Sequence, residues 1–289
     1  MKHHRVWYAA FLAPALLLFL LIYAYPVVMV IWTSFFNWKL LKPMEFIGLD
    51  NYIRLFTRDR EFGIALRNTA YWVLLQSTVH VGLGVLIALV LSKKPKGWKF
   101  VRTAYMIPII ISSAARAILF LSVFNPQMGL VNSVVRGLGF TGFAHNWYYD
   151  PHTSFWTVTM GWLLFASTIT IIVLAEIATI PDSLIEAARI DGANSLQIDW
   201  YILLPMLRSI IGTSVILAAT SMLKEFEMIF LTSQGGPNSM TVNLPLYLYK
   251  TAMTLNNYGY ANAIGTFLIV CGLVIVLLTT RLFRFGQTD

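Results

Sequence analysis

The longest uncharged stretch near the start of this chain runs from Val6 to Trp38, a total of 33 residues. A helix needs about 20 apolar residues to cross a bilayer, whereas the apolar part of a secretory signal is only about 7–15 residues long. We therefore expect a retained first membrane span, in which Pro14 and Pro26 allow kinks. The composition agrees, because 57% of the 289 residues are hydrophobic and only 12% are charged.

Five further segments are long and apolar enough to cross a membrane. The sequence therefore predicts an all-α polytopic membrane protein with six transmembrane helices. The third segment contains Arg116, and the fifth contains Lys224, Glu225 and Glu227, so these two depart most from a simple apolar helix. The expected spans are 7–36, 68–92, 103–125, 154–178, 209–233 and 259–281.

A cluster of positive charge sets the expected orientation. Five Lys or Arg residues and no acid lie between positions 93 and 102. Cytoplasmic loops carry such an excess, so this loop, residues 179–208 and both termini are expected inside. The formal net charge of +8 is then a matter of topology and not a sign of nucleic-acid binding. The single cysteine, Cys271, excludes a disulfide within the chain and a cysteine metal site.

A short polar interruption separates two long apolar runs at residues 180–205. Ser183 and Glu186 fit a capping box at the start of a helix, with Pro181 just before it. Gly192 is placed to end that helix, because glycine tolerates a left-handed turn. A second amphipathic segment is expected from Leu196 to Leu204, stopping at Pro205. By itself this pattern also fits an interfacial connector between two spans.

The same interruption resembles the EAA motif of binding-protein-dependent ABC importer permeases. The similar residues are Glu-Ala-Ala at 186–188, Asp-Gly-Ala at 191–193, Gln197 and Ile-Leu-Leu-Pro at 202–205. Other segments resemble the carbohydrate branch of this family, the MalF-like subunits. These are Asn51-Tyr52, Asn68-Thr69, 226–232, Gly235-Gly236-Pro237 and Gly259-Tyr260-Ala261. The chain departs from the usual pattern at Glu227, where an Asp is usual, and at Gln234 in the glycine run.

The resemblance implies a type I ABC importer permease fold. Residues 1–63 would form the first span and first outer loop, and residues 64–289 the transmembrane core with a cytoplasmic coupling loop at 179–208. The residues implied in coupling to an ATPase are Glu186, Ala187, Ala188, Asp191 and Gly192. The residues implied in substrate binding are Ser113, Trp162, Phe165, Thr168, Ser221, Met222 and Glu225.

The resemblance also implies partners. They are a second homologous permease subunit, two cytoplasmic ATPase subunits and an extracytoplasmic sugar-binding protein, in a bacterial or archaeal cytoplasmic membrane. The chain has no Gly-x-x-x-x-Gly-Lys-Ser/Thr phosphate loop and no paired acid–base or nucleophile group. We therefore expect no enzyme, no metal site and no cofactor in this chain, with ATP and Mg bound by the partner ATPase.

Two other functions remain open at this point. Lys224, Glu225 and Glu227 could serve an ion-gradient-driven secondary transporter, or the chain could be a membrane anchor. Within a helix, Lys224 and Glu227 at i,i+3 would pair, which leaves Glu225 to line a sugar cavity with Ser221 one turn below it. Trp162 could stack on a sugar ring, although a Trp inside a span more often packs against other helices.

Overall fold

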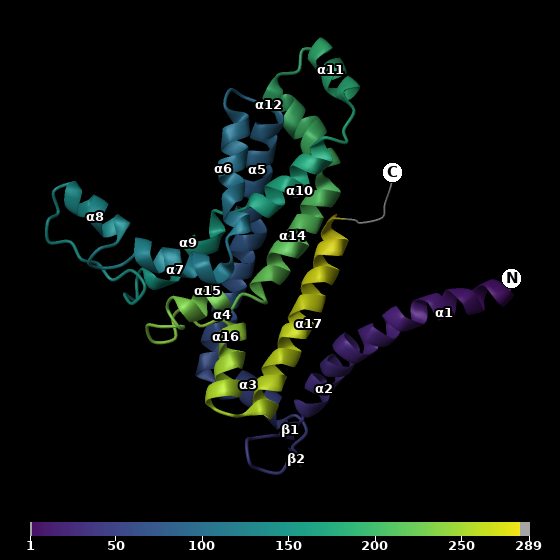
Figure 1. The fold of residues 1–289 in the computed structure, drawn as a ribbon, viewed down its shortest axis with the longest axis vertical. Helices are drawn as coiled ribbons and strands as arrows, with labels where there is room; N and C mark the ends of the chain where they lie inside the picture. Colours follow the sequence, from purple (N-terminus) through teal and green to yellow (C-terminus); the bar gives the residue numbers. More distant parts are fainter. Residues whose placement is uncertain (1, 284–289) are drawn as a thin grey trace. The chain divides into compact units, whose positions relative to one another are not determined.

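The computed structural model describes residues 2–283 and divides into two compact units. One unit joins residues up to 63 with residues 247–270, and the other joins residues 64–246 with those from 271. The described residues are almost entirely helical (Figure 1), which confirms the all-α prediction. The strands they contain are β1 (Phe36–Asn37) and β2 (Glu45–Phe46), which pair antiparallel with Phe36 opposite Phe46.

Helix length and composition support up to six spans. Four helical stretches are long and apolar enough to cross a membrane: Phe11–Thr33, Arg60–Ser92, Ser154–Ile177 and Tyr258–Phe283. Two bent pairs pass the same test, Trp98–Ile110 with Ser113–Val123 and Ser195–Met206 with Arg208–Leu231. The chain is therefore a multi-span membrane protein, and the first of these bent pairs lies within the predicted third span.

The first unit is assembled from α1 (Lys2–Phe19), the π-turn η1 (Leu20–Ala24), α2 (Tyr25–Thr33), α3 (Asp50–Thr57), η4 (Lys250–Thr254) and the first half of α17 (Tyr258–Phe283). The π-turn lies just before Pro26, where the wider backbone accommodates the proline ring and its missing N–H. Asn51 Nδ2 donates hydrogen bonds to the Ser34 and Phe36 carbonyls. A Cβ at Gly259 would lie 2.0 Å from the Phe36 carbonyl oxygen, so only glycine fits there.

Hydrogen bonds to Asp59 join the two sequence segments of this unit. Its carboxylate accepts hydrogen bonds from the hydroxyls of Tyr247 and Tyr260. The Arg54 guanidinium lies over the Tyr260 ring, 4.5 Å from the ring centroid. Burial alone would raise the pKa of Asp59, but the tyrosine hydrogen bonds, the Phe62 amide and Arg54 together hold this pKa below its usual value.

The second unit contains two apolar clusters. The first is centred on Trp72, Val158, Trp162, Met228 and Ile229. The second includes Val81, Ala88, Ile169, Val173 and Leu207. Around the second cluster, α5 (Val81–Ser92), α6 (Trp98–Ile110), α10 (Ser167–Ile177) and α14 (Arg208–Met222) lie side by side (Figure 1).

Close helix approach in this unit depends on small residues. A Cβ at Gly84 would lie 2.7 Å from Ile169 Cβ, so α5 and α10 could not approach this closely with a larger side chain. Asn68 Nδ2 donates to the Met240 and Val242 carbonyls, and the Leu244 N–H donates to Thr69 Oγ1. The Asn-Thr pair therefore holds the segment before α16 (Leu244–Tyr249) against α4 (Arg60–Leu75), next to the π-turn η2 (Gln76–His80).

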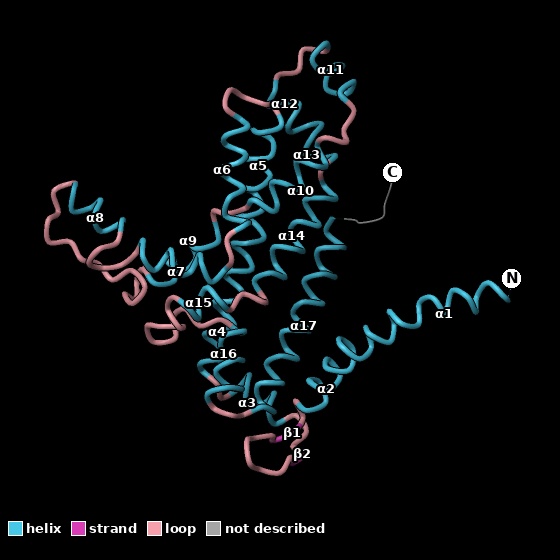
Figure 2. Tube along the Cα trace, viewed as in Figure 1, coloured by secondary structure: helices cyan, strands magenta, loops and turns pink. Residues whose placement is uncertain are grey.

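The third and fifth predicted spans each contain a break in the helix. The third predicted span, 103–125, consists of α6 and α7 (Ser113–Val123), which are bent by 106° because Ile111 is extended and Ser112 caps a new helix. The fifth, 209–233, consists of α14 and the short α15 (Glu227–Leu231), separated by residues 223–226. The fourth is also interrupted, between α9 (Ser154–Leu163) and α10. Figure 2 shows these breaks as loop segments within the helices, and α8 (Leu130–Gly137) as a separate helix.

Candidate functional site

The break in the fourth span is held against α6 by Tyr105. This residue of α6 accepts a hydrogen bond from the Ala166 N–H and donates one to the Leu164 carbonyl, at 3.0 and 3.2 Å. Its own carbonyl accepts from Ser167 Oγ. A broken helix leaves backbone groups without partners, which is costly inside a membrane. Tyr105 therefore makes the break after α9 stable, a role that its place in an apolar run did not indicate.

A cavity of about 160 Å³ opens between the breaks in the third and fourth spans. It is large enough for several water molecules or part of a polar ligand. Two of the residues expected to bind substrate, Phe165 and Thr168, line it, together with Arg116. The full lining is Pro108, Ile109, Ile111, Arg116, Phe165, Ser167 and Thr168.

Two buried polar side-chain atoms on α7 lack a hydrogen-bond partner within the described residues. They are Ser113 Oγ and Arg116 Nε. Buried polar groups of this kind are normally paired, so they indicate a place for water or ligand. Ser113 is the first residue of α7, directly after the bend, and not in the middle of a span as expected. Arg116 also interacts electrostatically with Glu225.

Trp162 and Met222 belong to the first apolar cluster rather than to this cavity. Trp162 is only 4% exposed, and its ring meets that of Trp72 edge-on at 5.4 Å. Met222 is 3% exposed in the same cluster. These contacts favour the packing interpretation of Trp162, although its Nε1 has no hydrogen-bond partner within the described residues.

Ser221 and Glu225 do not share a helix face. The helix α14 ends at Met222, so the expectation that Ser221 lies one turn below Glu225 is wrong. Glu225 lies in the break, where its Oε1 accepts a hydrogen bond from the Met228 N–H at 3.1 Å and so caps α15. Its carbonyl accepts from Asn243 Nδ2. The exposed Ser221 donates to the Ala218 carbonyl.

The expected helical pair between Lys224 and Glu227 is also wrong. Lys224 precedes α15 and Glu227 begins it, so the i,i+3 geometry of one continuous helix does not apply. Both side chains are exposed, and no ion pair joins them within the described residues.

The polar interruption folds as the isolated helix α11 (Asp182–Ile190), shown with loops at both ends in Figure 2. Pro181 is its N-cap, and no side chain caps it, so the predicted box of Ser183 and Glu186 is wrong. The predicted C-terminus is confirmed. Gly192 has φ +87°, its N–H donates to the Arg189 carbonyl, and the Ala193 N–H donates to the Ala188 carbonyl. These two bonds form a Schellman motif.

The helix α11 has one attached face and one open face. Ile185, Ala188 and Ala193 pack against the second apolar cluster. Glu186, Ala187, Asp191 and Gly192 are exposed, whereas Ala188 is half-buried, so four of the five residues implied in coupling are accessible to a partner.

The predicted second helix forms, with different ends. It comprises α12 (Ser195–Ile198), the π-turn η3 (Asp199–Leu203) and α13 (Leu204–Met206). The capping box absent from α11 occurs here, because Asn194 Oδ1 accepts from the Gln197 N–H and Gln197 Oε1 accepts from the Asn194 N–H. Pro205 lies inside the helix and does not stop it, since the π-turn before it accommodates the ring.

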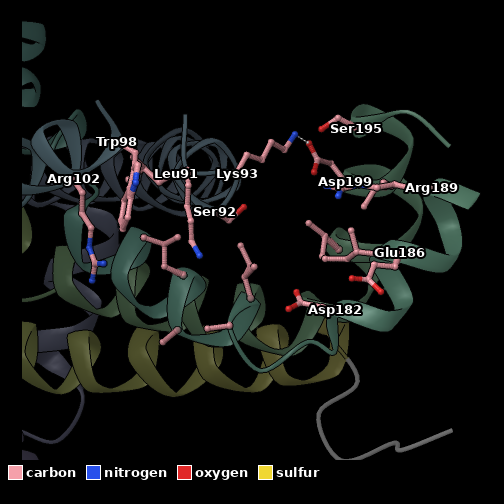
Figure 3. A pocket seen from close by; sticks show the side chains of 18 of the residues that line it. Leu91, Ser92, Lys93, Trp98, Arg102, Asp182, Glu186, Arg189, Ser195 and Asp199 are labelled. Carbon is pink, nitrogen blue, oxygen red and sulfur yellow. Dashed lines mark hydrogen bonds and ion pairs between the residues drawn. The ribbon is translucent and has the colours of Figure 1, made fainter. Parts of the chain in front are cut away.

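A second cavity, of about 770 Å³, lies behind α11 (Figure 3). Asp182, Glu186 and Arg189 of α11 line one side, and Trp98 and Arg102 of α6 line the other. At its edge Lys93 reaches across to Asp199, with Nζ 2.5 Å from Oδ2. These two residues lie 106 positions apart, and no sequence pattern indicated that they would pair.

Interrupted spans around a polar cavity, and a capped helix displayed outside the spans, define a membrane transport component. The comparison with known families agrees. The family model described as "Binding-protein-dependent transport system inner membrane component" matches residues 80–285. The chain belongs to this family and is a permease subunit of an ABC importer.

Relatives and solved structures match nearly the whole chain. The multiple sugar-binding transport system permease protein MsmF of Streptococcus mutans is 33% identical, over 95% of this chain and 94% of its own. The probable ABC transporter permease protein YurN of Bacillus subtilis is 32% identical, over 96% of each chain. A bacterial alginate ABC transporter, crystallised in complex with an alginate pentasaccharide-bound periplasmic protein, contains a chain of 25% identity. That chain has a TM-score of 0.86, with 100% of this chain and 97% of that chain covered.

Proposed function

We propose that this permease carries a sugar or oligosaccharide into the cell by alternating access, driven by ATP. The observation that carries the proposal is the cavity between the broken third and fourth spans. It combines an aromatic ring, Phe165, with a hydroxyl, Thr168, and a guanidinium, Arg116. Sugars present hydroxyls for hydrogen bonds and C–H faces for aromatic rings, so this lining suits them. The names of the sugar-transporting relatives support the same substrate class.

Substrate contacts are assigned by position. Phe165, Thr168 and Arg116 would contact sugar directly, and Ser113 would donate from the start of α7. Glu225 would act indirectly, by holding the start of α15 through its hydrogen bond from the Met228 N–H and by its charge interaction with Arg116. Trp162 and Met222 would support the site from the apolar cluster, and Ser221 would face the path from the end of α14.

The power source would be a separate ATPase that docks on α11. The exposed Glu186 would make a polar contact with it, Ala187 and Ala188 would permit close approach, and Asp191 with Gly192 would form the turn. ATP and Mg would be bound by that partner. A full importer would contain a second homologous permease, two ATPases and an extracytoplasmic sugar-binding protein. Both termini and α11 would then face the cytoplasm, as the charge cluster at 93–102 requires.

The alternative of an ion-gradient-driven transporter is less well supported. It required Lys224, Glu225 and Glu227 to act together within a span. Lys224 and Glu227 are exposed and do not pair, and Glu225 caps α15. Family membership independently favours the ABC importer.

Site-directed labelling tests the substrate cavity. In a Cys271→Ser background, a cysteine introduced by Thr168→Cys should react with a water-soluble thiol reagent, because Thr168 is exposed and lines the cavity. The transported sugar, delivered by the binding protein to the reconstituted complex, should slow that reaction. A matched Thr159→Cys control, buried at 0% exposure in the first apolar cluster's helix, should not react. Unchanged labelling of Thr168→Cys during sugar transport would contradict the assignment.

A further inference from the structure

The ion pair between Lys93 and Asp199 joins two parts of the chain that no backbone hydrogen bond connects. Lys93 is the C-cap residue of α5, and Asp199 is the first residue of η3. The Asp199 side chain is 10% exposed and that of Lys93 is 40% exposed. The second carboxylate oxygen of Asp199 is buried and has no hydrogen-bond partner within the described residues. Asp199 therefore relies on Lys93 for charge compensation.

Asp199 is connected to α11 through two hydrogen-bonded turns. The Schellman motif at Gly192 fixes the end of α11, and the Ala193 N–H belongs to that motif. The next residue, Asn194, opens the capping box of α12, which runs directly into Asp199. Because every turn in this path is closed by hydrogen bonds, a displacement of Asp199 displaces α11.

Lys93 is in turn fixed to the membrane spans. It ends α5, whose Val81, Val85 and Ala88 lie in the second apolar cluster with Ile169 and Val173 of α10. A movement of α11 can thus pass through Asp199 and Lys93 to α5. From α5 it reaches α10, which lines the sugar cavity through Ser167 and Thr168.

Apolar packing alone would hold α11 near the spans without fixing its direction. The contacts of Ile185, Ala188 and Ala193 with the second cluster are apolar, and apolar contact is non-directional. An ion pair with a buried carboxylate has one favourable geometry, because separating the charges leaves the carboxylate uncompensated. The pair therefore supplies what the apolar contacts lack, a directional link.

We propose that Lys93 and Asp199 are positioning residues that transmit the movement of α11 to the membrane spans, so that ATP hydrolysis and sugar import stay coupled. This inference rests on the proposed function, since it assumes that α11 docks on an ATPase. Neither residue touches sugar or nucleotide in this scheme.

The test uses the reconstituted full complex with its binding protein, in proteoliposomes. Sugar imported per ATP hydrolysed is measured for Lys93→Met, Asp199→Asn and the exchanged pair Lys93→Asp with Asp199→Lys. Lys94→Met is the matched control, because Lys94 lines the same cavity but makes no ion pair within the described residues. ATPase retention on the permease is measured in parallel.

Each single variant should keep the ATPase bound and still hydrolyse ATP, while import per ATP falls at least about fivefold, as expected for the loss of one coupling contact. The exchanged pair should recover most of the ratio, and Lys94→Met should match the wild type. Single variants with a normal ratio, an exchange no better than the single changes, or loss of the ATPase from the complex would each overturn the inference. A wild-type complex that imports no sugar with ATP would instead refute the proposed function.

Discussion

The turn at Gly192 allows the docking role of α11 to be tested by a graded substitution series. Gly192 has φ +87°, and a Cβ added there would meet nothing within 4 Å. Substitution therefore adds backbone strain without a steric clash. For an alanine the left-handed conformation costs about 1–2 kcal/mol. Asparagine tolerates this region better, and proline cannot adopt it.

The backbone strain sets how much of the native turn each variant is expected to lose. A cost of about 1–2 kcal/mol lowers the ratio of native to non-native turn by a factor of about 5–30. Gly192→Asn should therefore reduce ATPase retention least, and Gly192→Ala should reduce it more. Gly192→Pro should reduce ATPase retention most, because it also removes the N–H that donates to the Arg189 carbonyl at 3.1 Å.

The assay is ATPase retention on the purified permease together with sugar uptake in proteoliposomes. Membrane insertion should be unchanged throughout, because the turn lies outside the spans. Gly82→Ala is the control, since its Cβ also meets nothing within 4 Å and its backbone is helical. If Gly192→Pro retains the ATPase and transports at the wild-type rate, or if all three variants behave alike, the reasoning from turn geometry is refuted.

Three further predictions concern orientation, the α15 cap and the Asp59 cluster. Reporter fusions after residue 98 and after residue 145 should read cytoplasmic and external respectively, and the reverse pattern would overturn the topology. Glu225→Gln should transport nearly normally because it keeps an acceptor for the Met228 N–H. Glu225→Leu removes the cap at a cost of about 0.5–2 kcal/mol and should reduce uptake without preventing assembly. Normal uptake by the Leu variant would contradict the capping role of Glu225. The pKa of Asp59 is held low, so its stabilising effect is complete above the unfolded pKa of about 3.9 and is lost as pH falls through the lower folded value. The difference in thermal stability between wild type and Asp59→Asn should therefore shrink on acidification below about pH 4, and a constant difference would refute this.

The residues behind the family resemblance proved to have two different uses. Asn51, Asn68 and Gly259 are scaffolding, because each satisfies or permits a backbone contact between segments distant in sequence. Glu186 and Gly192 lie on an exposed helix and turn and so remain available to a partner. A sequence motif specifies residue types and their spacing but not their contacts. It therefore did not distinguish the residues that hold segments together from those exposed to a partner.

The sequence by itself determined the class of fold, the presence of several membrane spans, the helix at 182–190 and its end at Gly192. These features depend on the length of apolar segments, on local charge and on backbone preferences, all of which are local properties. Only the tertiary structure decided where the third, fourth and fifth spans break. Ser113 lies at the start of α7 and Glu225 lies just before α15, whereas both were expected inside helices. A break inside a membrane requires partners for the freed backbone groups, and those come from Tyr105 and Asn243 on other segments. The pairing of Lys93 with Asp199 likewise depends on how the helices pack, which hydropathy and local patterns do not encode.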